Sequence, residues 1–415
     1  MRSIPRVWFT GSTMALRGSV LHLSENLTLP FDRRVWMELG ALRAAGLEVS
    51  AICPTGESHQ APYEVIDGIH IWRYPAPPPT RGVLSYIWEF LYCWLQTLRL
   101  SVVVLARRGF DIIHAANPPD TFWAVALPYR LFGKRFVFDH HDLCPELYLA
   151  RFGPQREGDL AHRALGWLEW AQFRTADLVI STNESYRQVA LTRGGMAADR
   201  VVVVRSGPSR ERFATVRAVD PSLKRGRRFL VAYLGVMAPQ DGVDHLLRAA
   251  HHLIGRGRSD IAFTLMGAGD SFEDLRRLAR ELGLDDHVHF TGRIPDAEVE
   301  VTLATADVCV SPDPLNPLND VSTMNKVLEY MACGRPMVAF DLREHRFSAA
   351  EGALYARPNC DVDFGDRIVE LLDDPARRER MGEYNRQRFL DRMAWEHNAG
   401  HLVRAYERLC ATIPG

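Results

Sequence analysis

The sequence carries little that would direct it to nucleic acid, to a disulfide-rich fold or to a structural metal. Lys and Arg (50) nearly balance Asp and Glu (51), so the net charge of −1 gives no reason to expect nucleic-acid binding. The 7 cysteines are scattered, odd in number and without a C-x-x-C pair, which is unlike a disulfide framework or a zinc module. This cysteine usage favours a reducing, cytoplasmic location.

Familiar nucleotide and metal motifs are also missing. No G-x-x-x-x-G-K-[ST] run occurs, so the chain has no P-loop. Gly267 and Gly269 follow a predicted strand, but Phe272 stands where a dinucleotide fingerprint has its third glycine. His140 and His141 are adjacent, alternate faces on an extended chain, and have no acidic cluster of ligand spacing beside them. We therefore expect neither a dinucleotide cofactor nor a metal.

The N-terminal residues lack a clear signal peptide. The apolar run from Val7 to Leu16 is short and interrupted, and no small-residue cleavage site follows it. We predict that residues 1–18 form a loose extension, with Met14 as an alternative start of the chain.

The longest apolar stretch, residues 83–105, is long enough to span a bilayer, but Glu89, Gln96 and Arg99 interrupt it. Aromatic residues gather at its start, as they do in helices that lie in a membrane interface. Two interpretations stay open. The stretch is either a helix that covers a sheet or a helix that inserts partly into a membrane surface, which would place the protein at the inner face of the membrane.

Apolar runs alternate with amphipathic stretches in both halves of the chain, which predicts an α/β fold of parallel sheets covered by helices. A length of 415 residues predicts two domains, whose shared crevice would be the ligand site. We predict Rossmann-like domains at 19–208 and 228–390, separated by a charged linker at 209–227. The predicted strands are 20–23, 49–53, 112–114, 136–138, 178–181, 201–204, 229–234, 261–266, 288–290, 307–310 and 337–340.

The most informative segment runs from Ser322 to Pro336 and predicts a short helix between two strands. Ser322 suits an N-cap, Gly334 suits the C′ position and Pro336 blocks extension. Lys326 and Glu329 are three residues apart and share one helix face. The start of such a helix at the carboxyl edge of a parallel sheet favours a phosphate, so Lys326 could bind phosphate and Glu329 sugar hydroxyls. The alternative is a surface Lys–Glu pair.

Residues 322–332, Ser-Thr-Met-Asn-Lys-Val-Leu-Glu-Tyr-Met-Ala, resemble the donor-binding helix of family 4 glycosyltransferases of GT-B fold. The resemblance implies two Rossmann-like domains around a cleft, with a C-terminal helix (391–415) that crosses back to the first domain. It implies transfer of a sugar, with retention, from a nucleotide-sugar donor, expected to be a UDP-sugar, without a metal or other cofactor. The apolar stretch 83–105 suggests a polyprenyl-linked saccharide as acceptor; a free saccharide is the other candidate.

The resemblance also assigns candidate site residues. His141 would lie near the donor sugar or the reacting centre, and Lys326 and Glu329 would bind the diphosphate and the ribose. The other candidates for binding the nucleotide are Gln240, Gly242, Arg293, Ile294, Thr323 and Asn325. The candidates for binding the donor sugar or the acceptor are Arg33, Arg34, Asn117, Asp142 and Asp320.

The chain departs from the family at charged positions. Val236 and Asp241 stand where the family usually has a phosphate-binding Arg and Lys, so Lys326, Arg33, Arg34 or backbone N–H groups would have to bind the diphosphate. Val321 occupies the position of the family's first carboxylate, with Asp320 one place away. Two other functions stay open: a nucleotide-sugar epimerase of the same fold, and a catalytically silent subunit that binds a partner.

Overall fold

The computed structural model describes residues 16–413 apart from residues 57, 78–82 and 214–217, and it describes no side chain of residues 83–87. The chain forms two compact units. Unit 1 contains the residues up to Leu149, Gly153–Arg205 and the segment from Glu396, whereas unit 2 contains Ala150–Phe152 and Ser206–Trp395. The predicted extension 1–18 lies mostly outside the described residues.

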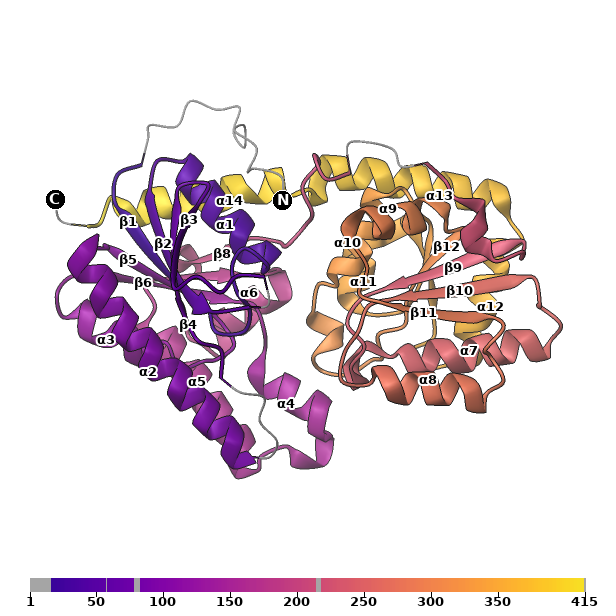
Figure 1. Ribbon diagram of the computed structural model, residues 1–415, viewed down its shortest axis with the longest axis horizontal. Helices are drawn as coiled ribbons and strands as arrows, with labels where there is room; N and C mark the ends of the chain where they lie inside the picture. The colour runs from indigo at the N-terminus through magenta and orange to yellow at the C-terminus, as the bar shows by residue number, and fades with distance from the viewer. Residues whose placement is uncertain (1–15, 57, 78–82, 214–217, 414–415) are drawn as a thin grey trace. The chain divides into compact units, whose positions relative to one another are not determined.

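Unit 1 is built on an eight-stranded sheet with the order β3-β4-β2-β1-β5-β6-β7-β8 (Figure 1). All neighbouring strands pair in parallel except β3 and β4, which form an antiparallel hairpin. The strands are β1 Ser19–Leu23, β2 Glu48–Pro54, β3 Tyr63–Ile66, β4 Ile69–Tyr74, β5 Ile112–Ala116, β6 Arg135–His140, β7 Leu178–Ser181 and β8 Val201–Val203.

Helices cover both faces of this sheet (Figure 1). They are α1 Arg33–Ala44, α2 Val83–Arg107, α3 Trp123–Arg130, α4 Cys144–Phe152, α5 Leu160–Thr175, α6 Glu184–Thr192 and α14 Trp395–Cys410. In α1, Val35, Leu39 and Leu42 are fully buried, as their spacing of three and four residues predicts. Asp32 caps this helix by accepting a hydrogen bond from the Val35 N–H.

Unit 2 has a six-stranded, entirely parallel sheet with the order β11-β10-β9-β12-β13-β14. The strands are β9 Phe229–Leu234, β10 Ile261–Met266, β11 Val288–Gly292, β12 Val308–Ser311, β13 Met337–Phe340 and β14 Ala353–Ala356. The helices are α7 Val243–Gly255, α8 Phe272–Glu281, α9 Asp296–Thr305, α10 Asn325–Ala332, α11 Arg343–Ala349, α12 Asp361–Leu372 and α13 Pro375–Arg388. Both units are therefore Rossmann-like, which confirms the predicted fold class.

All eleven predicted strands are present, some longer than predicted at their polar ends. Strands β3, β4 and β14 were not predicted. The hairpin turn between β3 and β4 is Asp67-Gly68, and both residues have positive φ (49° and 77°), as a type I′ turn requires. The Asp-Gly pair between two β-rich segments is thus a signal that the sequence does contain.

One predicted helix cap is wrong. Helix α10 begins at Asn325, and Ser322 instead donates its hydroxyl hydrogen bond to the Leu318 carbonyl. The predicted end of α10 is right, because Gly334 lies just beyond the helix with φ of 63°, in the left-handed region that favours glycine.

The apolar stretch 83–105 forms helix α2, and neither of its two interpretations accounts for the whole helix. Cys93, Leu100 and Val104 are buried in the core of unit 1. Trp88 and Leu95, among others, are exposed on the opposite side of the helix. By length and composition, Trp88–Arg107 is also the one helix among the described residues that could cross a membrane. Only 28% of its apolar window is buried, which is less than a core helix buries.

Candidate active site

In unit 2 the candidate residues gather where the loops after β9 and β12 meet the start of α10. Gly242 ends the first of these loops with φ of 65°, and a Cβ atom there would lie 2.1 Å from the Pro312 carbonyl oxygen. Only glycine therefore allows the loop after β9 to approach the loop after β12 this closely. The contact is completed by Asn319, whose side-chain amide donates to the Gln240 carbonyl (2.8 Å).

Lys326 lies at the centre of this region and is buried. Its ammonium group donates to Asp313 Oδ1 (2.7 Å) and lies 3.7 Å from Asp241 Oδ1. The same ammonium group lies 4.9 Å from the centroid of the Tyr233 ring. Lys326 is therefore compensated by two carboxylates and is not paired with Glu329, which excludes the alternative of a surface Lys–Glu pair.

The charged groups around Lys326 shift one another's pKa values. Burial alone lowers the pKa of Lys326, but Asp313 and Asp241 outweigh it, so the net shift is upward and the group stays cationic. Burial raises the pKa of Asp241 to about 6, although Lys326 acts in the opposite direction. Asp241 therefore changes its charge closer to neutral pH than an ordinary aspartate does.

Glu329 lies three residues further along α10 and has a different partner. Its Oε2 accepts a hydrogen bond from Arg212 (3.2 Å), a residue of the segment that was predicted to be a linker. Arg212 also lies 3.7 Å from Glu300 and 3.8 Å from Asp296. Burial lowers the pKa of Arg212, but these carboxylates outweigh it and raise the pKa. Glu329 therefore belongs to a second charged group, distinct from that of Lys326.

The other predicted residues of unit 2 are distributed around these two groups. Gln240 has a buried side-chain oxygen, Oε1, without a hydrogen-bond partner among the described residues. Asn325 is exposed at the first position of α10, whose N-terminus has no side-chain cap. Thr323 donates to Glu344 Oε2 (3.2 Å). Arg293 is exposed, and Ile294 packs against the core.

Asp320 does not take the place of the missing first carboxylate in this structure. Its Oδ1 accepts a hydrogen bond from the Arg343 backbone N–H (2.9 Å) at the first residue of α11, and its Oδ2 lies 3.7 Å from Arg343 Nε. The carboxylate therefore stabilises the start of α11.

In unit 1 the loops after β5 and β6 are joined by Asn117. Its side-chain oxygen accepts hydrogen bonds from the N–H groups of His141 (2.6 Å) and Asp142 (3.1 Å). Its amide donates to the Asp142 carbonyl (2.7 Å) and to Asp120 (3.0 Å). The structure thus brings together the predicted residues Asn117, His141 and Asp142. Burial raises the pKa of Asp142, with His141 and His140 acting against it.

The His141 ring lies between an acid and a cation. Its Nε2 is 2.5 Å from Asp139 Oδ2 and 2.6 Å from Arg34 Nε. A carboxylate only accepts and a guanidinium only donates, so Nε2 can donate to Asp139 or accept from Arg34, but not both at once. In a neutral ring, this choice determines which of the two nitrogens carries the proton.

Arg34 is buried, in contrast to its exposed neighbour Arg33. Its NH2 group lies 3.0 Å from both Glu38 Oε1 and Asp139 Oδ1, and its NH1 group donates to the Val204 carbonyl (2.9 Å). Burial raises the pKa of Asp139, but His141 and Arg34 outweigh it and hold that pKa well below its usual range. Arg34 therefore compensates buried carboxylates. Its role as a cation for the donor or acceptor stays a prediction.

The same cluster offers three potential metal ligands, because atoms of Glu38, Asp139 and His141 lie within 4.8 Å of one another. However, the Arg34 guanidinium already lies within 3.0 Å of both carboxylates and 2.6 Å from the imidazole. This donor set thus fits an arginine as its cation. The prediction of metal-free chemistry stays a prediction.

Sequence reasoning missed Glu38, Asp139 and Asp313. Asp139 and Asp313 stand at strand ends in His- and Pro-rich loops, which is a readable signal. Glu38 is four residues after Arg34 on the same helix, a spacing typical of an ion pair. Glu25 follows β1, and burial raises its pKa to about 8, so it is largely a neutral acid at pH 7. Nothing in the sequence around Glu25 indicates that shift.

A cavity at another edge of the unit 2 sheet lies away from these residues. It has a volume of about 520 Å³ and is lined by Asp307, Arg335 and Pro336, at the amino ends of β12 and β13, and by residues of α13. Ligand sites of parallel α/β sheets lie at the carboxyl ends of strands, so this cavity is not the candidate site.

Comparison with known proteins agrees with this geometry. The family described as glycosyl transferases group 1 matches residues 228–374, and the glycosyl transferase 4-like domain matches residues 32–207. A GDP-mannose-dependent alpha-(1-6)-phosphatidylinositol monomannoside mannosyltransferase of Mycolicibacterium smegmatis is 34% identical over 380 residues, which cover 79% of this chain and 95% of that protein. A 2-deoxystreptamine glucosyltransferase of Streptomyces kanamyceticus is 25% identical over 357 residues, with 82% and 88% covered.

Among solved structures, sucrose-phosphate synthase from Thermosynechococcus elongatus superposes with a TM-score of 0.77 at 20% identity. The match covers 95% of this chain and 99% of that one, and it shows the fold alone. Together, the two family matches and the mannosyltransferase show that the chain belongs to the family 4-like glycosyltransferases of GT-B fold.

Proposed function

We propose that this glycosyltransferase moves a sugar from a nucleotide-sugar donor to a hydroxyl of a saccharide or a polyprenyl-linked saccharide, with retention at the anomeric carbon. The reaction would serve surface polysaccharide or glycoconjugate synthesis. The observation that carries the proposal is the position of Lys326, a buried cation on the first turn of α10, beside an N-terminus without a side-chain cap. Such a terminus offers backbone N–H groups and a favourable dipole to a phosphate.

Each group would have a distinct role. The ammonium group of Lys326 and the N–H groups at Thr323 and Asn325 would stabilise the departing diphosphate. Glu329 would accept hydrogen bonds from the ribose, and the unpartnered Gln240 Oε1 could accept another from the nucleotide. His141 would contact the donor sugar or the acceptor hydroxyl. In this proposal a phosphate oxygen of the donor takes the acceptor proton at the same face, and no metal or cofactor takes part.

The alternative of a silent, partner-binding subunit has one observation in its favour. Two carboxylates already compensate Lys326, so a diphosphate would have to compete with Asp313 and Asp241 for its charge. The epimerase alternative gains nothing from the structure, because Asp320, the nearest carboxylate to the missing position, is engaged with α11.

The test is a screen of the purified chain with UDP-, GDP- and dTDP-sugars, read by thermal stabilisation and by products, with and without a membrane lipid extract. A UDP-sugar and GDP-mannose come first, the latter because it is in the name of the mannosyltransferase relative. Stabilisation by one donor, with nucleoside diphosphate released only when extract is present, would support the transferase. A rearranged nucleotide sugar would indicate the epimerase, and no stabilisation by any donor would indicate the silent subunit.

We also propose that the protein acts in the cytoplasm, at the inner face of the membrane, with residues 83–105 as the membrane contact. The support is the exposed apolar side of α2.

A further inference from the structure

We propose that unit 1 docks on an anionic lipid bilayer through a surface formed jointly by α2, α3 and α5. This inference rests on the proposed function, in which the protein meets its acceptor at a membrane. It defines the surface of the protein that contacts the membrane and the charge of the lipid. We call this surface the three-helix surface. Figure 1 shows the three helices on the same side of the sheet of unit 1, and the side chains of all three enter one core cluster.

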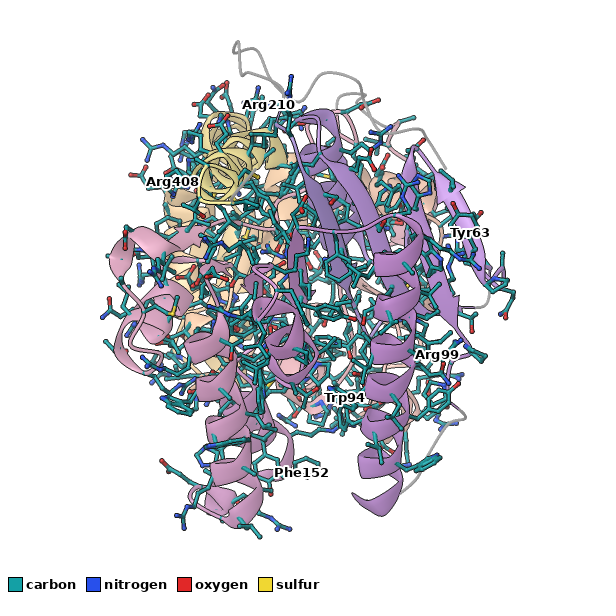
Figure 2. All side chains as sticks on the ribbon, turned by 90° about the vertical axis from the view of Figure 1, so that its left-hand side faces the viewer. Tyr63, Trp94, Arg99, Phe152, Arg210 and Arg408 are labelled. Carbon is teal, nitrogen blue, oxygen red and sulfur yellow. The ribbon has the colours of Figure 1, made fainter. Side chains whose placement is uncertain are left out.

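Helix α2 exposes one apolar stripe. Trp88, Leu91, Leu95, Val102 and Leu105 are all exposed. Successive members are three, four, seven and three residues apart, so they lie on one side of the helix. Figure 2 views the molecule from the side of unit 1, with Trp94 and Arg99 labelled. The stripe is interrupted on its own side by the exposed Arg99, and it points away from the buried Cys93, Leu100 and Val104.

Helix α5 exposes a second stripe with the same character. Leu160 is 84% exposed, and Trp167 and Trp170 are about half exposed. These positions follow the helical spacing, with Arg163 and Ala164 exposed between them. Two tryptophans on the outer side of a helix are costly in water and favourable at the boundary between lipid headgroups and acyl chains.

Helix α3 joins the two stripes. The Trp123 ring packs edge-on against the Trp167 ring of α5 (centroids 5.7 Å apart, 86° between planes). One helical turn and two turns further along, Leu127 and Leu131 are exposed. A cavity of about 290 Å³ lies between the helices and is lined by Phe90, Leu91, Trp94, Thr121, Trp123, Ala124 and Leu168. Only Thr121 in this lining is polar, so the cavity suits hydrocarbon.

The charged residues of the three-helix surface indicate the charge of the lipid headgroups. Among the described side chains of α2 and α5, every exposed charged residue is an arginine: Arg99, Arg107, Arg163 and Arg174. The acid Glu169 of α5 is buried, where it pairs with Arg193. Glu89, between Trp88 and Phe90, is partly exposed, so the fully exposed charges of these two helices are all positive while one acid lies near the start of α2. Apolar and aromatic stripes with this excess of exposed arginine are complementary to a bilayer that carries negative headgroups.

The contacts of α2 favour a helix that lies on the membrane over one that crosses it. Thr97 and Ser101 are buried on its inner side, and Ser101 Oγ is 2.8 Å from the Tyr129 hydroxyl of α3. A bilayer-spanning α2 would have to give up this hydrogen bond and its packing on the sheet.

The experiment measures binding of the full chain to vesicles by co-sedimentation, without any donor, so that its failure is separate from failure of the donor screen. Phosphatidylcholine vesicles are compared with vesicles that also contain phosphatidylglycerol. We expect binding to the anionic vesicles that weakens as salt is added, and at least about tenfold weaker binding to phosphatidylcholine alone.

Two double variants and two matched controls complete the test. Arg163→Glu/Arg174→Glu and Trp167→Ser/Trp170→Ser should each weaken binding to anionic vesicles at least about tenfold. The controls alter exposed arginines and exposed apolar residues of unit 2: Arg276→Glu/Arg277→Glu on α8, and Val236→Ser with Val362→Ser. They should leave binding unchanged. Thermal melting confirms that each variant folds. If the tryptophan variant does not fold, the arginine variant alone tests the proposal.

The proposal is overturned if the chain binds neither kind of vesicle, or if binding ignores lipid charge and salt. It is also overturned if the variants of the three-helix surface bind as tightly as the controls, or if the chain resists alkaline extraction from vesicles as a spanning protein does.

Discussion

Each unit buries one cation between two carboxylates at the carboxyl side of its sheet, and the two groups differ in how firmly they are closed. In unit 1, Arg34 lies 3.0 Å from both Glu38 and Asp139, and neither carboxylate has any exposed surface. In unit 2, Lys326 lies 2.7 Å from the buried Asp313, but Asp241 is 3.7 Å away and 16% exposed. Both carboxylates of the first group are inaccessible, whereas the second group has one carboxylate in a longer and partly exposed contact.

This difference separates a group that holds the fold from one that can exchange a partner. The guanidinium of Arg34 fixes α1, β6 and the Val204 carbonyl through a rigid set of donors, so movement would break several contacts at once. Lys326 is a single ammonium group on a flexible stem, and the pKa of Asp241 is already raised to about 6 by burial. A phosphate could therefore replace Asp241 as its partner at a small cost.

The largest effect is expected for Arg34→Met. The substitution would leave two buried carboxylates without their cation, which typically costs about 3–5 kcal/mol in the free energy of unfolding. Arg33→Met, at the exposed neighbouring position, should stay within about 0.5 kcal/mol of the parent. Urea denaturation of both variants measures the difference. Equal losses would mean that the buried group of unit 1 does not hold the fold.

The next effect concerns the ribose. Glu329→Gln should weaken nucleotide binding by about 1–3 kcal/mol, the usual value of a hydrogen bond to a charged group. Glu298→Gln, at an exposed position on α9, should leave the affinity unchanged. Titration calorimetry with the nucleotide gives both values. If Glu329→Gln lowers only the melting temperature, the residue acts solely as the partner of Arg212.

The smallest effect is the pH dependence of donor binding. As the pH falls from 7 to 5, Asp241 takes up a proton and Lys326 becomes less compensated, so a nucleotide sugar should bind about three- to tenfold more tightly. A nucleotide sugar is the right probe because its diphosphate has no free terminal phosphate that titrates in this range.

Asp241→Asn should bind the nucleotide sugar tightly at both pH values and lose the dependence, while Asp285→Asn, at an exposed position, should keep it. A pH dependence that persists in Asp241→Asn would assign it to another group and would weaken the contrast between the two units.

The sequence predicts the fold well because the buried strands are apolar runs and the helices are amphipathic. Strand β9, Phe229–Leu234, and strand β10, Ile261–Met266, have the predicted bounds for this reason. Strand β6 extends past its predicted end because Asp139 and His140, polar residues that suggest a loop, are paired inside unit 1.

The candidate site could be predicted only in part. The motif around Lys326 and Glu329 locates α10, but the ion pairs of these residues depend on Asp313 and Arg212, which lie 13 and 117 positions away in the chain. Arg34 follows the loop after a strand, so the sequence alone suggests a cation that could bind a ligand. Only the three-dimensional fold shows that Glu38 and Asp139 surround it. Residue types indicate where charge is present, whereas its compensation is set by contacts distant in sequence.

The most direct test of the central claim, that Lys326 serves the donor diphosphate, compares a nucleotide sugar with the corresponding free nucleoside as ligands of Lys326→Met. We expect the dissociation constant of the nucleotide sugar to rise at least about tenfold, because a charged hydrogen bond to phosphate is lost, while that of the nucleoside stays the same. Thermal melting confirms that the variant is folded. Equal changes for both ligands, or no change for either, would contradict the claim.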